Sequence, residues 1–295
     1  MLKKFFTGLS LALLSLIVVG CGSRHGKTKV LSVPVGHVVA DSVVSFRRDA
    51  QCRIHIDFAY LKGKKYAAVN DSLLRMGTLQ PNYLAISYER LVPQSAVRTI
   101  MERYAREYSE LAQWLHDREK ARSQLDWELN IKTRIIPGRG KRLVYLSDIY
   151  IKTGDAASRY QLAHNFDPET GRQTRLSDEF GADYKERLTK DIVEQMADQL
   201  GLDDDNLASL QRAGYFAMID PYPAENFILY DDSVTFIYTA GEINPKECVV
   251  FEDSYNGLKA GTAAGARVIA LATTNPLEKL KEYTSEIIND FTEMI

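Results

Sequence analysis

Residues 127–173 read WELNIKTRIIPGRGKRLVYLSDIYIKTGDAASRYQLAHNFDPETGRQ. Apolar and polar residues alternate over 127–135, which is typical of a strand with one buried face. The turn at 137–140 leads to a returning run over 143–151, and 160–166 forms a third strand. Links this short cannot make parallel crossovers, so the stretch predicts an antiparallel meander.

Two amphipathic helices flank this meander. The first opens at Ser95, and the second covers about 183–200 and ends at Gly201, a typical residue after a helix C-terminus. In the first, six apolar residues line one face at a 4-3-4-3-4 spacing: Val97, Met101, Tyr104, Tyr108, Leu111 and Leu115. Such a stripe could bind a partner, but packing on the protein's own sheet is the favoured interpretation. The sequence therefore predicts an α+β fold, an antiparallel meander packed by two helices.

Composition and motifs argue against several functional classes. The formal net charge is −2, whereas a nucleic-acid binder usually carries a basic domain or stripe. Cys52 and Cys248 lie in dissimilar segments, so no disulfide framework is expected. We find no zinc-type histidine spacing, no nucleophile elbow and no phosphate-binding glycine loop. The acidic run 203–206 lacks the Gly and Glu of a calcium loop, so we interpret it as the N-cap of a helix beginning near Leu207.

The N-terminus has the pattern of an export signal. Lys3 and Lys4 precede an apolar run over 5–19, too short to span a bilayer, which needs roughly 20 residues. Cys21 directly follows Gly20, and the stretch resembles the lipobox of bacterial lipoproteins. An ordinary cleaved signal peptide is the alternative. The resemblance implies acylation of Cys21 after removal of residues 1–20, with 21–34 as a tether, and hence a lipid-anchored protein on the extracytoplasmic side of the bacterial cell envelope.

Two motifs characterise the middle of the chain, residues 35–243. One is NFDPETGR at 165–172 followed by LSDEF at 176–180; the other is NFIL at 226–229 with VTFIY at 234–238. In this order they resemble the extracytoplasmic domain of the lysozyme-sensing anti-sigma factor RsiV and its relatives. The resemblance implies a binding domain, with lysozyme or peptidoglycan as the expected partner.

The last segment, 244–295, has a different pattern. A buried strand ends in Glu252 and Asp253, a helix of small residues follows, and a second buried strand covers 268–271. This is a βαβ unit, and it resembles a Rossmann-like part of the β-phosphoglucomutase-like haloacid dehalogenase phosphatases. In that family the acids matching Glu252 and Asp253 help to bind Mg²⁺.

The phosphatase resemblance is incomplete. The chain contains no nucleophilic Asp-x-Asp motif of the required form, and without the nucleophile no aspartyl-phosphate intermediate can form. The change of family near residue 244 makes the chain an apparent chimera. We therefore predict a non-catalytic envelope protein that needs no cofactor; the alternative is a sugar-phosphate phosphatase or mutase using Mg²⁺. A third possibility is an accessory protein of a cell-wall enzyme.

Overall fold

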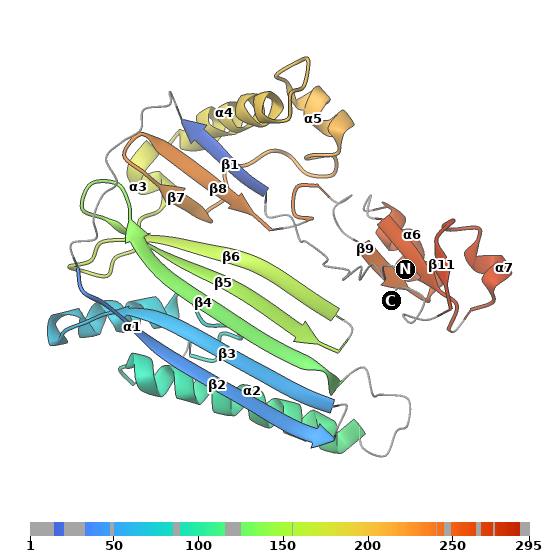
Figure 1. Ribbon diagram of the computed structural model, residues 1–295. Coiled ribbons are helices and arrows are strands. Elements are labelled where there is room, and N and C mark those ends of the chain that lie inside the picture. The colour runs from blue at the N-terminus through green and yellow to red at the C-terminus, as the bar shows by residue number, and fades with distance from the viewer. Residues whose placement is uncertain are drawn as a thin grey trace, which may run out of the picture. The chain divides into compact units, whose positions relative to one another are not determined.

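The computed structural model describes residues 15–20, 33–47, 50–84, 89–115, 125–154, 156–239, 241–244, 249–263, 267–273 and 275–289 (Figure 1). The chain divides into two compact units. One consists mainly of Val18–Tyr184 with Ala224–Ile237, and the other mainly of Lys185–Pro223 with Tyr238–Ile295. The mixture of helices with a mainly antiparallel sheet confirms the α+β class.

A five-stranded sheet forms the larger unit. Its strands, in spatial order, are β2 (Val35–Arg47), β3 (Ala50–Leu61), β4 (Trp127–Pro137), β5 (Leu143–Thr153) and β6 (Ala156–Phe166). β4, β5 and β6 are antiparallel neighbours, which confirms the meander. β3 and β4 are parallel, because the chain between them crosses over through two helices.

Two strand predictions are corrected. The sequence pattern over 30–57 favours short strands, but β2 and β3 are long, with 13 and 12 residues. They form one antiparallel ladder, in which exposed residues of β2 alternate with residues that pack on the core. β6 starts at Ala156 rather than Tyr160. Its first residues pair with β5, but they are exposed and show no apolar alternation, so the sequence pattern did not reveal them.

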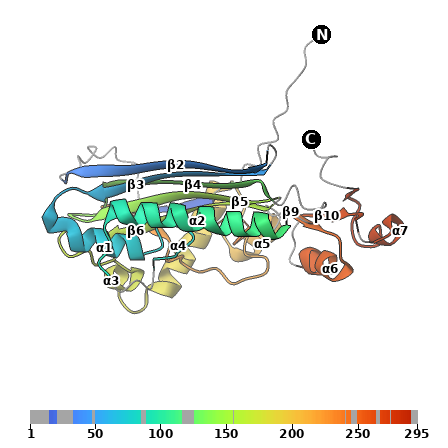
Figure 2. The same cartoon turned by 90° about the horizontal axis from the view of Figure 1, so that it is seen from below.

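The helices η1 (Lys64–Tyr66), α1 (Ala67–Arg75) and α2 (Pro93–Leu115) join β3 to β4. Figure 2 shows α1 and α2 on the same side of this sheet. α2 packs against β2 and β3, and its buried residues include Val97, Tyr104 and Tyr108. The apolar stripe of this helix is therefore core, as the favoured interpretation predicted.

Buried side chains continue the pairing of β3 with β4 where the backbone ladder ends. The last pair in register is Asp57 with Lys132. Beyond it, the Ala59 N–H donates to Thr133 Oγ1 at 2.7 Å, and the Tyr145 hydroxyl donates to the Ala59 carbonyl at 2.8 Å. Both backbone groups of Ala59 are thus satisfied inside the core, where an unpaired group would be costly.

The elements after the meander are α3 (Leu176–Phe180), α4 (Tyr184–Gln199), α5 (Leu207–Ala213), β7 (Phe227–Leu229) and β8 (Ser233–Tyr238). The Asn206 side chain accepts from the Ser209 N–H, which confirms the N-cap. β7 and β8 form an antiparallel hairpin. On its other side β8 pairs with β1 (Ser15–Gly20), a strand that lies within the predicted leader.

The C-terminal segment forms a sheet separate from the others. It contains β9 (Val249–Glu252), α6 (Tyr255–Ala263), β10 (Arg267–Leu271), α7 (Leu277–Leu280) and β11 (Ile287–Ile288). β9 and β10 are parallel, which confirms the βαβ unit; β11 adds a parallel strand that we did not predict. This geometry occurs in many α/β folds and does not by itself identify a phosphatase.

Candidate functional site

The predicted site residues fall in two places. Cys21 lies outside the described residues, so its acylation stays a prediction. Among the described helices, none combines the length and the apolar character needed to cross a bilayer. Glu252 and Asp253 are described, and both lie at the carboxyl end of β9.

The Glu252 and Asp253 carboxylates are engaged within their own segment. Glu252 Oε1 accepts from the Ser254 N–H at 2.9 Å, and Asp253 Oδ2 accepts from the Thr273 hydroxyl at 3.1 Å. The described residues contain no group of three or more His, Cys, Asp or Glu side chains that could hold a metal ion. Two carboxylates from one loop do not make the near-octahedral oxygen site that Mg²⁺ demands, so these residues alone do not fit this ion.

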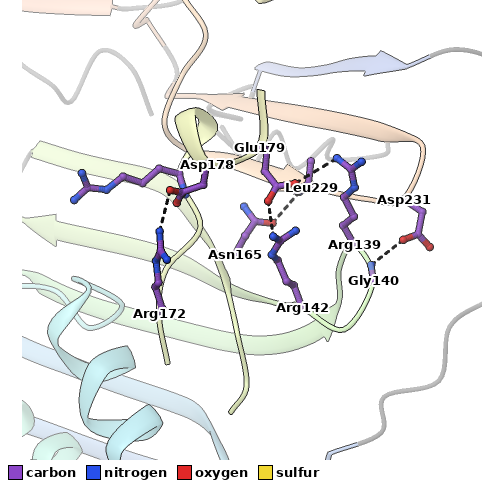
Figure 3. Close-up of polar contacts among 10 residues, drawn as sticks. Arg139, Gly140, Arg142, Asn165, Arg172, Asp178, Glu179, Leu229 and Asp231 are labelled. Carbon is purple, nitrogen blue, oxygen red and sulfur yellow. Dashed lines mark hydrogen bonds and ion pairs between the residues drawn. The ribbon is translucent and has the colours of Figure 1, made fainter. Parts of the chain in front are cut away.

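The motif of residues 165–180 lies at a junction between the β4–β5 turn, the end of β6, α3 and β7 (Figure 3). We call it the motif junction, and its side chains are Arg139, Arg142, Asn165, Arg172, Asp178, Glu179 and Asp231. Asn165, which is buried, donates to the Phe227 carbonyl at 2.8 Å and accepts from the Leu229 N–H at 2.9 Å. A single amide side chain thereby holds β7 against β6.

Two acidic side chains, Asp167 and Asp178, fix the conformation of the turn after β6. Asp167 Oδ1 accepts from the N–H groups of Glu169 and Thr170, both at 2.8 Å. These bonds, with that of Thr170 foremost, lower the pKa of Asp167. Asp178 accepts from the Arg175 N–H and from the Arg172 guanidinium, and both lower the pKa of Asp178. Several polar groups of this motif therefore form hydrogen bonds with one another.

Glu179 is the most enclosed charge in the motif junction. Its side chain is only 8% exposed, and its carboxylate contacts Arg142 at 2.5 Å and Arg139 at 3.4 Å. A nearly buried carboxylate needs such partners, because an unpaired buried charge is strongly destabilising. The pair of arginines ties the β4–β5 turn to α3, and Figure 3 shows both guanidinium groups directed at Glu179. The motif junction can therefore hold the surrounding elements in a fixed arrangement. Among its side chains, no nucleophile contacts a base.

Sequence reasoning missed a second polar region, on the side of the sheet away from α1 and α2. We call it the outer sheet face and define it by residues of β2, β3 and β4: His37, Val39, Asp41, Val43, Arg53, His55, Asp57 and Glu128. His37 Nδ1 lies 2.6 Å from Asp57 Oδ1, and His55 Nδ1 lies 2.7 Å from Asp41 Oδ1. His55, on the polar side of its strand, is partly exposed and bonded across the strands. The alternation V-x-H-x-V-x-D-x-V over 35–43 was the available signal.

Further charges at the margin of this face are also paired. Asp126 contacts Lys152 at 2.6 Å and Arg53 at 3.2 Å, and Arg53 lies 3.6 Å from Glu128. Burial acts to raise the pKa of Asp126, but Lys152 and Arg53 together hold it below its ordinary value. In contrast, Val39 and Val43 are 58% and 62% exposed. The face therefore combines polar side chains that are bonded to one another with exposed apolar side chains, which suits contact with another macromolecule.

Cys52 lies on the opposite, buried side of β3 and is a free thiol. Burial raises its pKa to about 12, against the weaker effect of the nearby Arg53 charge. A thiol of such high pKa is a poor nucleophile. Cys52 is thus part of the core rather than of a reactive site.

Comparisons with known proteins support the fold. No protein-family model and no curated protein matches the chain. Among solved structures, a member of the DUF3298 family from Bacteroides fragilis is similar over 70% of this chain and 90% of its own, with 21% sequence identity and a TM-score of 0.55. A DUF3298 family protein from Pseudomonas aeruginosa matches over 72% of this chain and 86% of its own, with 14% identity and a TM-score of 0.45. The chain is therefore similar in fold to a bacterial DUF3298 protein.

Proposed function

We propose that this protein is a lipid-anchored, non-catalytic binding or sensing protein on the extracytoplasmic side of the bacterial cell envelope, with an RsiV-like domain that binds lysozyme or peptidoglycan. The lipobox-like stretch ending at Cys21 supports the location. The motifs of 165–180 and 226–238 support the kind of domain, and the likeness in fold to a bacterial DUF3298 protein is compatible with it.

The observation that carries the binding role is the outer sheet face. The sheet has α1 and α2 on one side only, and the other side exposes Val39 and Val43 among hydrogen-bonded polar side chains. Polar groups that already bond to one another cost less to desolvate than isolated ones, because each keeps its partner when water leaves. A ligand that docks there would gain apolar contact without leaving one of these groups unpaired.

Anchoring is tested by Cys21→Ser. Expression in a bacterium with labelled palmitate should label the unchanged chain and move it to the membrane fraction. Cys21→Ser should lose the label. A substituted chain that keeps its label would contradict acylation at Cys21.

Binding is tested with the Cys21→Ser chain, using hen lysozyme and purified peptidoglycan as separate probes. Val43→Lys, on the outer sheet face, should weaken capture of the bound probe at least about tenfold, because a charge at an exposed apolar position removes the apolar contact and would have to be desolvated without a partner. Met218→Lys is the matched control, since Met218 is also 62% exposed but lies elsewhere. Failure to bind either probe would contradict the proposed ligands.

A phosphatase or mutase is the second candidate, favoured only by Glu252 and Asp253 at a parallel strand's carboxyl end beside Thr273. Hydrolysis of a sugar phosphate that requires Mg²⁺ and is lost in Asp253→Asn would support it. Absence of turnover above background would end it.

A further inference from the structure

The two edges of the five-stranded sheet differ in how far other residues cover their backbone groups. On the β6 edge, the Ala163 N–H donates to Asn226 Oδ1 and the Asn226 amide donates to the Gln161 carbonyl, each at 2.8 Å. The outward carbonyl of Asn165 accepts from the Thr174 N–H at 2.8 Å. The Asn226 side chain and the loop at Thr174 thus engage three outward backbone groups of β6 between residues 161 and 165.

The β2 edge has no such cover among the described residues. β2 pairs with β3 on one side, and the sheet order ends with it. Over its 13 residues β2 contains neither Lys nor Pro, and its bulge lies only at the far end, between Ser45 and Arg47. Natural edge strands usually carry such features to prevent pairing with another chain. Their absence along Val35–Ser45 leaves an edge that is competent to pair.

The register identifies the backbone groups that face outward. The Lys62 N–H donates to the Pro34 carbonyl at 2.8 Å, and the next pair is Val35 with Leu61. Hydrogen-bonded and non-bonded pairs alternate in an antiparallel ladder, so the even-numbered residues of β2 bond to β3. The odd-numbered residues therefore direct their N–H and C=O groups to the free edge. Among them, the side chains of residues 37, 39, 41 and 43 are exposed on the outer sheet face, and Val35 is partly buried.

These outward residues read Val35, His37, Val39, Asp41, Val43, a pattern that is complementary to itself when reversed. We propose that β2 pairs antiparallel with β2 of a second copy of this chain, with the two-fold axis at Val39. Val39 then lies opposite Val39, His37 opposite Asp41 and Val35 opposite Val43. Each outward N–H meets an outward C=O, and the two sheets become one continuous sheet.

Charge selects this register over its neighbour. An axis at Asp41 would place the two Asp41 carboxylates opposite each other, and like charges directly opposite are destabilising. With the axis at Val39, each Asp41 faces an imidazole. Because His37 already contacts Asp57 and Asp41 already contacts His55, the cross-strand row would run Asp57, His37, Asp41, His55 through the two copies. Each Asp41 would then lie between two imidazoles, His55 of its own copy and His37 of the second copy.

The first test is oligomeric state, measured by sedimentation on the purified Cys21→Ser chain without any ligand, so the result is independent of the proposed function. The unchanged sequence should form a dimer in a concentration-dependent manner. Val39→Pro removes an outward N–H that makes no bond to β3, and proline is tolerated at an edge. It should raise the dimer dissociation constant at least about tenfold while the Tm shows that the monomer still folds. A monomer at all soluble concentrations, or a dimer unaffected by Val39→Pro, would overturn the proposal.

The second test reads the register directly, in a Cys21→Ser, Cys248→Ser background where the remaining Cys52 is buried. Residues in a bonded antiparallel pair have Cα atoms about 5.5 Å apart, within the range of a disulfide. Val39→Cys should therefore cross-link to itself under mild oxidation. Val43→Cys is the matched control, since its expected neighbour is Val35 and not a second Val43. Equal cross-linking of both variants, or cross-linking of Val43→Cys alone, would contradict the register.

Discussion

The main sheet and the C-terminal βαβ segment are both built on buried strands, but they differ in what surrounds those strands. In the main sheet, residues from β3, α1, α2, β4 and β5 form one cluster, whose largest members include Phe58, Tyr108 and Tyr145. In the C-terminal segment the described cluster has four buried residues: Leu258, Val268, Ala270 and Leu280. Neighbouring residues of that segment are only partly buried.

This difference has an energetic consequence. Apolar burial contributes roughly 25 cal/mol per Å², and each ordered residue opposes it with conformational entropy. A cluster of four small or medium side chains offsets little of that entropy, whereas the larger cluster is supported from several elements. We therefore expect the main sheet to unfold as a cooperative unit and the C-terminal segment to open separately, at lower free energy.

The largest effect should come from Ile56→Ala. Ile56 is fully buried in the main cluster, so its truncation should leave a cavity and reduce the free energy of unfolding by about 2–5 kcal/mol. Denaturant unfolding followed by far-UV circular dichroism measures it. Val43→Ala, 62% exposed on the adjacent strand, should stay within about 0.5 kcal/mol of the unchanged chain. A similar loss in both variants would mean that this sheet is not the cooperative core.

Leu258→Ala tests the other side of the comparison. Leu258 is fully buried within the small cluster, and its loss should abolish hydrogen-exchange protection over 249–271. Protection of β3 and β4 should be unchanged in the same experiment. Leu277→Ala is the control, because Leu277 belongs to the same segment but is 40% exposed. Equal loss of protection in β4 would show that the two regions unfold together.

The sequence predicted the parts of both regions that depend on local pattern. The β4–β6 meander follows from alternation and short turns, and the cap at Asn206 follows from one side chain beside a helix start. The parallel pairing of β9 with β10 follows from two apolar runs separated by a helix. In each case the residues that decide the structure are neighbours in the chain.

The features that the sequence did not predict depend on contacts between segments that are not adjacent in the chain. The pairing of β3 with β4 joins residues more than 70 positions apart, such as Cys52 and Trp127, through a crossover whose length no local pattern fixes. The contacts of Glu179 with Arg139 and Arg142 depend on how α3 docks on the β4–β5 turn, about 40 positions earlier in the chain, and that of His55 with Asp41 depends on the register of the β2–β3 ladder. Glu252 and Asp253, by contrast, lie at a strand end where the βαβ pattern placed them.

Acidification should lower the stability of the main sheet, through His164 on β6, more than that of the C-terminal segment. Burial lowers the pKa of His164 to about 4 from an ordinary value of 6.5, although a backbone contact at Met76 opposes the shift. The unfolded chain then binds a proton that the folded chain does not, so stability is complete above about pH 6.5 and falls as the pH decreases through about 4. The full loss would be about 3 kcal/mol for the main sheet.

Measurement of unfolding free energy at several pH values tests this, with His164→Gln as the comparison. That variant should flatten the dependence between pH 6.5 and about 5, where few carboxylates titrate. The C-terminal segment contains no histidine after residue 244, so its local opening energy should stay constant in this window. An unchanged slope in His164→Gln would assign the effect to other groups.

The smallest effect should come from Arg267→Ala, although its ion pair is the best formed in the C-terminal segment. The Arg267 guanidinium meets both carboxylate oxygens of Glu286, with the shortest contact at 2.5 Å, and the pair lowers the pKa of Glu286. Both side chains are nonetheless about half exposed, so water and salt screen the attraction. We expect hydrogen exchange of β10 to change far less in Arg267→Ala than in Leu258→Ala, at both low and high salt. If the two variants were equal, charge rather than apolar burial would be holding this segment together, and its four-residue core would not explain its stability.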